Sequence, residues 1–245
     1  MVPFDDLPQN QLVAMLPRDE WATMSPHLEF MSMPRGLTLY EPGDEVRNVY
    51  FPVSCSISVF AVLKDGSCAE ISTVGREGMI GVSAFMGGDS TPSRAVVDTA
   101  GYAYRMKGAI LKREFNRAGA LQRVLLLYTQ AMMAQVVQTA ACNRRHSVQQ
   151  QLCQRLLRSL DRGEPSNVLA MTHETIGNML GVRREGVSEA AGKLQRAGII
   201  SYSRGRITIL DRAALEECVC ECYQLVKSEF GRLLPGKTAS KPMAL

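Results

Sequence analysis

Hydrophobic and polar positions change their period along the chain, and each change predicts a different kind of structure. Residues 1–30 carry short helix-like runs that are broken at Pro17 and Pro26. From Thr38 to about Met106, short alternating runs separated by Pro-Gly-Asp and Asp-Gly predict strands joined by tight turns. Closely spaced short strands of this kind are typical of a small antiparallel barrel or roll.

An almost unbroken helical pattern follows, from residue 109 to residue 162. One row at 4-3-4-3 spacing comprises Leu121, Leu125, Tyr128, Met132, Gln135, Thr139, Cys142 and His146. A second, apolar row comprises Val124, Leu127, Ala131 and Ala134. We expect one face to cover the β-rich region and the other to meet a second copy, so the helix over 120–162 predicts a homodimer. Burial of the helix wholly within one chain is the alternative.

The pattern over residues 171–210 is the most specific in the chain. Thr172 is the expected N-cap of a short helix that Gly181 ends, and a second short helix begins within three residues and stops at Gly198. Their expected inner faces comprise Ile176, Met179, Leu180, Val187, Ala190, Ala191 and Leu194. Two helices joined so tightly predict a helix-turn-helix, and the hairpin around residues 204–206 predicts a wing.

The charges of this segment lie where such a module would use them. Residues 183–206 hold six basic and two acidic side chains, a surplus equal to the net charge of +4 of the whole chain. Expected base contacts at the start of the second helix are Arg183, Arg184, Glu185, Ser188 and Glu189. Expected phosphate contacts are Thr172, Lys193, Arg196, Arg204 and Arg206. We expect His173 to lie beside a phosphate or in solvent. An ordinary solvated face is the alternative, but the coincidence with a tight turn and a basic wing favours DNA binding.

Composition narrows the class of protein. The 245 residues, 46% of them hydrophobic, suit two modest domains. The seven cysteines, with no secretory signal, are typical of reduced thiols in a cytoplasmic protein. We find no apolar run long enough to predict a membrane span. The expected location is therefore the cytoplasm, without membrane contact.

The stretch IGNMLGVRREGVSEAAGKLQRAGII, residues 176–200, resembles the recognition segment of the Crp/Fnr family of bacterial transcription regulators. The resemblance covers nearly the full chain and implies an α+β fold. Its parts would be an antiparallel β-roll of the cyclic-nucleotide-binding type (1–119), a dimerisation helix and connector (120–163), a winged helix-turn-helix (164–234) and a disordered tail (235–245). In family terms Arg184 and Glu185 occupy base-reading positions. Glu189 stands where many members have arginine, so the family's operator does not carry over.

The resemblance also implies a sensor pocket. Its expected residues are Gly81, Val82, Ser83, Ala84, Ser93 and Arg94. Cyclic-nucleotide binders of the family pair the phosphate with an arginine, which Arg94 supplies, and the ribose with a glutamate, where this chain has Val82. Valine cannot accept the ribose hydrogen bond, so cyclic AMP is disfavoured and the effector stays unidentified. No cysteine precedes Cys55 to hold the family's N-terminal iron–sulfur cluster, and no histidine lies in the strand region to bind haem.

Three cysteines lie close together in the sequence ECVCECY, at positions 218, 220 and 222. If one helix runs from Ala213 to Leu234, Cys218 and Cys222 share a face and Cys220 points the other way. Three thiolates so arranged cannot meet on one zinc ion, so we predict no metal and no cofactor, and core packing for the inward pair.

Together these patterns predict a homodimeric regulator that binds a double-stranded DNA operator, with RNA polymerase as a further candidate partner and no enzyme activity. A thiol redox-responsive regulator, or one that binds DNA without an effector, is the alternative. A cupin-like metalloenzyme on the β-roll is disfavoured, because such a site needs histidines on the strands and none is there.

Overall fold

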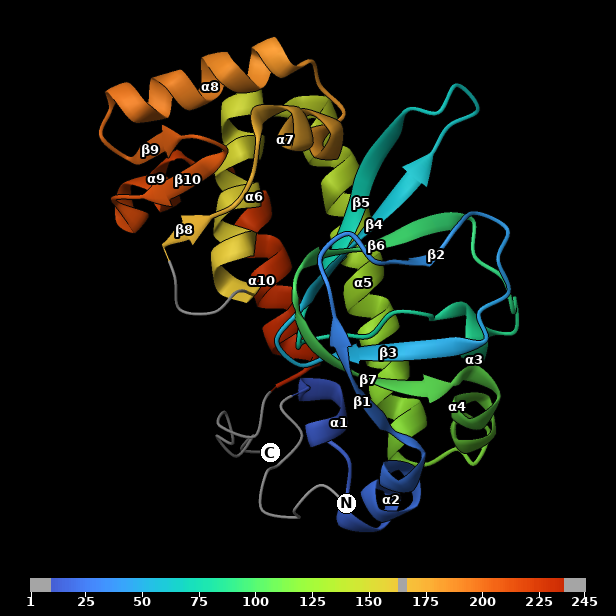
Figure 1. Ribbon diagram of the computed structural model, residues 1–245. Coiled ribbons are helices and arrows are strands. Elements are labelled where there is room, and N and C mark those ends of the chain that lie inside the picture. The colour runs from blue at the N-terminus through green and yellow to red at the C-terminus, as the bar shows by residue number, and fades with distance from the viewer. Residues whose placement is uncertain (1–9, 163–166, 236–245) are drawn as a thin grey trace, which may run out of the picture.

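The computed structural model describes residues 10–162 and 167–235 (Figure 1). An N-terminal β-rich lobe is followed by a long helix and by a C-terminal lobe of helices with one small sheet. This is the predicted α+β architecture. The predicted boundary at residue 163 and all but the first residue of the predicted tail lie outside the described residues.

The N-terminal lobe is an antiparallel β-roll. Its leading helices are α1 (Gln11–Ala14), α2 (Arg18–Met24) and a 3-10 turn (Ser25–His27). Its strands are β1 (Glu29–Met33), β2 (Thr38–Tyr40), β3 (Asn48–Pro52), β4 (Ser56–Val62), β5 (Cys68–Val74), β6 (Ser93–Thr99) and β7 (Gly101–Lys107). They form two sheets, in the orders β1-β7-β3 and β2-β6-β4-β5, and every pairing is antiparallel. Helices α3 (Ser83–Met86) and α4 (Gly108–Phe115) complete the lobe, so the strand region is confirmed as a roll.

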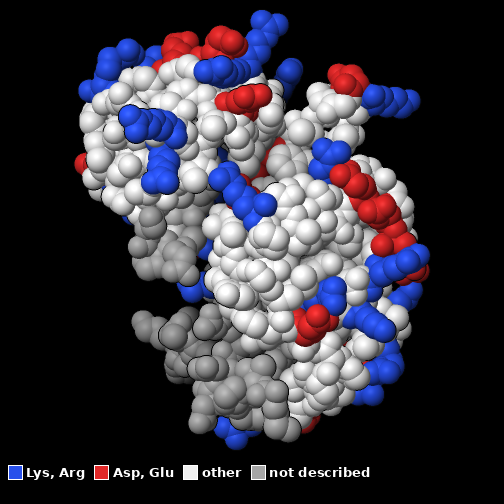
Figure 2. Space-filling model, viewed as in Figure 1, with Lys and Arg blue, Asp and Glu red and all other residues white. Residues whose placement is uncertain are grey.

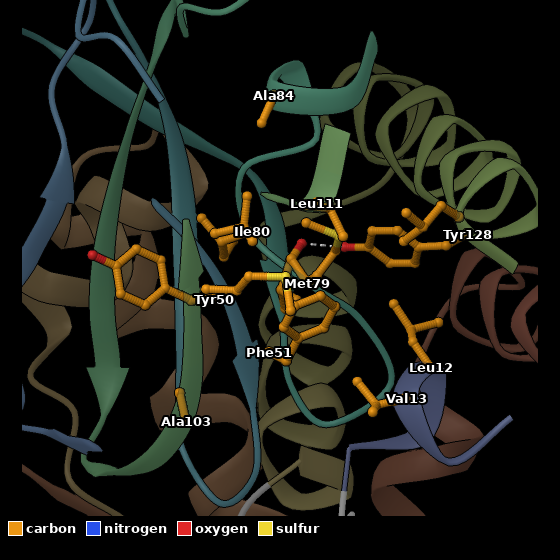
Figure 3. Packing of buried hydrophobic residues seen from close by; sticks show 14 of the residues in the cluster. Leu12, Val13, Tyr50, Phe51, Met79, Ile80, Ala84, Ala103, Leu111 and Tyr128 are labelled. Atoms are coloured by element: carbon orange, nitrogen blue, oxygen red, sulfur yellow. Dashed lines mark hydrogen bonds between the residues drawn. The ribbon is translucent and has the colours of Figure 1, made fainter. Parts of the chain in front are cut away.

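The core of this lobe lies between the sheets and the long helix α5 (Ala120–Arg145). In Figure 3, Tyr128 of α5 points toward Met79, and its hydroxyl donates a 2.8 Å hydrogen bond to the Met79 carbonyl. Gly78 leaves room for this ring, because a Cβ there would lie 2.6 Å from the nearest atom of Tyr128. Burial of a side chain of this size stabilises the fold by about 1.5–3 kcal/mol. Tyr128 therefore fixes α5 against the roll.

The predicted helix over 120–162 is two helices. Helix α5 ends at Arg145, and α6 (Val148–Arg162) begins after an extended residue, His146. The Ser147 hydroxyl accepts from the Gln150 backbone N–H at 3.3 Å, and the Gln150 side chain accepts from the Ser147 N–H at 3.1 Å. This reciprocal capping box satisfies free N–H groups at the start of α6 and so stabilises the break.

Helix α6 belongs to the core of the C-terminal lobe. Its buried face, with Leu152, Leu156 and Leu157, packs in one cluster with Ile176 and Val187. The lobe also contains β8 (Val168–Leu169), α7 (His173–Leu180), α8 (Arg184–Arg196), β9 (Ile200–Ser203), β10 (Arg206–Ile209) and α9 (Arg212–Cys218). The last helix, α10 (Cys222–Leu233), runs along α5, so that Tyr223 packs in the core of the C-terminal lobe and Leu233 packs in the core of the roll. From α5 to α6 the chain therefore passes from one core to the other at the break between these helices, and the domain boundary at residue 163 stays a prediction.

Both rows predicted on α5 are largely covered within the chain, with Leu125 and Tyr128 of the first row and Val124 of the second buried. A third row faces solvent, where Met133 is 61% and Val137 65% exposed.

The expectation that no segment could span a membrane needs one correction. By length and hydropathy alone, α5 meets the criteria for a membrane-spanning helix, but a helix packed on the core of a folded protein meets the same criteria.

The C-terminal helical segment differs from the single helix predicted over residues 213–234. Helix α9 ends at Cys218 and α10 begins at Cys222, because Val219 is extended. The break brings Cys220 and Cys222 into one buried cluster with Cys142 of α5. Cys218 instead packs against the core of the C-terminal lobe. The geometric argument that kept these thiols apart was therefore wrong.

A buried ionic cluster joins the two lobes. The guanidinium of Arg155 on α6 lies 3.1 Å from Glu70 and 2.7 Å from Asp98, and it donates to the Thr73 hydroxyl at 2.9 Å. Burial alone would lower the pKa of Arg155, but the two carboxylates outweigh it and raise that pKa. A third ion pair between α6 and the roll joins Arg162 to Glu77 at 2.6 Å. These pairs set the position of the C-terminal lobe on the roll.

Candidate nucleic-acid interface

Helices α7 and α8 form the predicted helix-turn-helix. The Thr172 hydroxyl accepts from the Thr175 N–H at 3.1 Å and so caps α7, and Gly181 ends that helix with a left-handed φ of 66°. A Cβ at Gly177 would lie 3.0 Å from the Val182 carbonyl, so glycine permits the close approach of the turn. The N-cap, the turn and both inner faces are confirmed.

Most of the predicted base-contacting residues lie on the open side of α8. Arg183 is its N-cap, and Arg184, Glu185 and Glu189 are exposed along its first two turns. Ser188 differs, because it is only partly exposed and its hydroxyl lies 2.9 Å from Nδ1 of His173. The exposed row carries guanidinium and carboxylate groups, which can bond guanine and cytosine edges respectively.

His173 of α7 contacts two other elements of this lobe, α8 and β9, which the sequence did not predict. From the first residue of α7, it is hydrogen-bonded to Ser188 of α8 and stacked on Tyr202 of β9, with ring centroids 4.0 Å apart. Its Nε2 is buried. Burial, followed by the charge of Arg184, lowers the pKa of His173 from 6.5. Of the two expectations for His173, the solvated side chain was wrong, and the phosphate neighbour stays a prediction. His173 packs α8 against β9 of the wing.

The predicted phosphate contacts surround this face. All five are exposed, namely Thr172, Lys193, Arg196, Arg204 and Arg206. Arg204 and Gly205 form the wing turn with φ values of 49° and 74°, so the two flanking strands project the basic side chains outward. Lys193 lies 2.9 Å from Glu189, one helical turn earlier. In Figure 2, Lys and Arg side chains spread over the end of the molecule that carries α8, with Asp and Glu among them.

The predicted sensor pocket is a cavity of about 180 Å³ in the roll. Of the expected residues, those that line it are Gly81, Val82, Ser83 and Ser93. Ala84 is buried in the core instead, and Arg94 lies 2.8 Å from Glu41 in an ion pair. Met132 and Val136 of α5 form part of the wall. The cavity is mainly apolar. Arg94, the side chain predicted to pair with a phosphate, already pairs with the Glu41 carboxylate.

Comparison with known proteins gives the same two domains. The Crp-like helix-turn-helix domain matches residues 150–218, and the cyclic nucleotide-binding domain matches residues 30–118. No curated protein sequence matches the chain.

Solved structures with this fold include FixK2 from Bradyrhizobium japonicum, with 19% identity, a TM-score of 0.68, and coverage of 79% of this chain and 98% of that one. The c-di-GMP-responsive regulator CLP of Xanthomonas campestris has 15% identity and a TM-score of 0.65, covering 80% of this chain and all of its own. A Crp/Fnr-family regulator from Thermus thermophilus has 20% identity and a TM-score of 0.61, with 80% and 98% covered.

A β-roll of the nucleotide-binding type, a long helix and a winged helix-turn-helix with a charged open face define a DNA-binding transcription regulator. The chain belongs to the Crp/Fnr family of these regulators. The fold and the family are those of regulators rather than enzymes.

Proposed function

We propose that the protein is a homodimeric regulator that binds a two-fold symmetric DNA operator through α8. The exposed start of α8, with Arg184 and Glu185 beside each other, is the observation that carries the proposal. In helix-turn-helix proteins this end of the second helix enters the major groove. The proposed location is the cytoplasm, where a bacterial-type regulator would meet its operator.

The exposed side chains divide into two roles. Arg184 and Glu185 read base edges, with Arg183, Ser188 and Glu189 as further base contacts. Glu189 becomes available when the exposed Lys193 turns from it to a phosphate, because such an exposed pair contributes about 0–1 kcal/mol. Phosphate contacts come from Thr172, Lys193, Arg196, Arg204 and Arg206, and these strengthen binding to any sequence.

The partner in the dimer is a second copy of the chain, which packs along α5. The exposed apolar side chains Leu126, Met133 and Val137 recur at 7- and 4-residue intervals on one face. Such spacing is typical of the seam between two helices. An exposed apolar row on a helix whose other two apolar rows are largely covered favours a partner over solvent.

The roll senses an effector other than cyclic AMP. Val82 lines the cavity where a ribose partner is needed, and Arg94 is paired with Glu41. CLP is named as responsive to c-di-GMP, so the fold itself does not require cyclic AMP. Because Met132 and Val136 of α5 line the same cavity, an effector there would contact the dimer helix directly and could shift a two-state equilibrium.

Two alanine variants test the division of roles at the DNA. Arg184→Ala should weaken binding to the preferred operator by about 1–3 kcal/mol and relax selectivity at one base pair of each half-site. Arg206→Ala, the matched control on the wing, should weaken binding to all sequences alike and reduce its salt dependence. Fluorescence anisotropy on operator and scrambled DNA over a salt series measures both effects. Unchanged discrimination in Arg184→Ala would contradict the assigned register of α8.

A further inference from the structure

Four metal-ligating side chains converge where the long helix meets the C-terminal helices. Cys142 and His146 come from the end of α5, and Cys220 and Cys222 come from the break between α9 and α10. Their ligand atoms all lie within 4.8 Å of one another, the three cysteines are buried and His146 is partly buried. The cluster lies outside the roll cavity and outside the DNA-binding face.

The spacing of these atoms suits a single tetrahedral ion. The Sγ atoms of Cys142 and Cys220 are 3.6 Å apart, and Nδ1 of His146 lies 3.4 Å from Sγ of Cys222. Zinc bonds sulfur at about 2.3 Å and nitrogen at about 2.0–2.1 Å, so tetrahedral ligand atoms stand about 3.5–3.8 Å apart. We propose that Cys142, His146, Cys220 and Cys222 bind one zinc ion in a Cys₃His site.

The surrounding side chains orient the ligands as in known zinc sites. Nε2 of His146 lies 3.4 Å from a Glu221 carboxylate oxygen, which leaves Nδ1 free to bind a metal. The Gln138 amide donates to Sγ of Cys222 at 3.0 Å, and Cys222 is also the first residue of the twelve-residue helix α10. An N–H donor and a helix N-terminus both stabilise a thiolate.

The donor set selects the ion and its role. Three thiolates and an imidazole favour zinc over calcium or magnesium, which prefer oxygen ligands. Four protein ligands leave no open position, so the ion is structural rather than catalytic. An iron–sulfur cluster attaches its thiolates to different iron atoms and would need a wider spacing than 4.8 Å. The site therefore fits one mononuclear zinc ion.

The position of the site gives it a structural consequence. It ties the end of α5 to the start of α10, and His146 is the residue at which α5 ends before α6 begins. The ion would thus hold together the junction from which the C-terminal lobe departs. The inference does not depend on the proposed DNA-binding function.

Elemental analysis of the full-length protein tests the site. Protein purified under reducing conditions with zinc in the medium, then desalted, should hold about one zinc per chain. Cys222→Ser should lose most of this zinc, and Cys218→Ser, four residues away but outside the cluster, should retain it. Cobalt substitution of the wild-type protein should give the strong sulfur-to-metal absorption of a tetrahedral thiolate site.

Titration of the metal-free wild-type protein with zinc keeps the test independent of how well the variants fold. Competition with a chromophoric chelator should show one equivalent bound per chain. Failure to bind it would overturn the proposal, as would equal zinc contents in Cys222→Ser and Cys218→Ser. Iron with inorganic sulfide in place of zinc would also overturn it, and so would a reduced chain that binds no metal but forms a Cys142–Cys220 disulfide in air.

Discussion

At the scale of single residues, the recognition helix depends on side chains that do not face DNA. His173 bonds Ser188 and stacks on Tyr202, so it joins α7, α8 and β9 at one point. Its Nε2 is buried, and burial together with the charge of Arg184 lowers its pKa. The neutral ring is therefore the form that supports the folded lobe.

This gives a pH dependence of known sign. The folded pKa of His173 lies below the unfolded value of 6.5, so the unfolded chain binds the proton more readily. The contribution of His173 to stability is present above pH 6.5 and is lost as the pH falls from there toward the lower folded pKa. Chemical unfolding over this range should show a loss of stability that His173→Gln reduces. The same slope in wild type and His173→Gln would contradict it, with His27→Gln in the other lobe as control.

Single residues also show what the sequence could predict and what it could not. The N-cap Thr172 and the terminator Gly181 follow from local backbone chemistry, so both were predictable. Tyr202 lies 29 positions after His173, and the stacking of the two rings depends on how the wing folds back. Arg94 was expected in the pocket, but its partner Glu41 lies 53 positions away, on a segment that no local pattern connects to it.

At the scale of elements, the breaks between helices determine which residues come together, and they were harder to predict than the helices. The capping box of Ser147 and Gln150 was readable in the sequence and would have divided α5 from α6. The extended residue Val219, which brings Cys220 and Cys222 together, has no comparable signal. Periodicity identified α5 but not which of its rows stays exposed, because that depends on the roll and α10 packing around it.

The exposed row of α5 carries the prediction about assembly. Val137→Glu should convert the dimer to a monomer, because two carboxylates would be buried in an apolar seam without partners. Leu63→Glu is the matched control, since Leu63 is similarly exposed at 62% but lies between β4 and β5. Analytical ultracentrifugation of the full-length chain measures the result. A wild-type monomer, or a Val137→Glu variant that stays dimeric, would contradict an α5 seam.

At the scale of the whole molecule, buried ion pairs and a shared helix join the β-roll to the DNA-binding lobe. Arg155 on α6 reaches Glu70 and Asp98 on the roll, and α5 both walls the roll cavity and leads into α6. A change of lobe position has to move these ion pairs, and a buried pair separated without new partners costs about 3–5 kcal/mol. The position of α8 relative to the roll therefore depends on these contacts.

Selection of binding sites from random double-stranded DNA by the full-length protein tests operator recognition by a homodimer. We expect one enriched, two-fold symmetric site, because two copies of α8 would enter successive major grooves with half-site centres about 10–10.5 base pairs apart. Selection with Arg184→Ala should leave one position of each half-site degenerate. Enrichment of no motif, or of a motif without two-fold symmetry, would contradict sequence-specific binding by a homodimer.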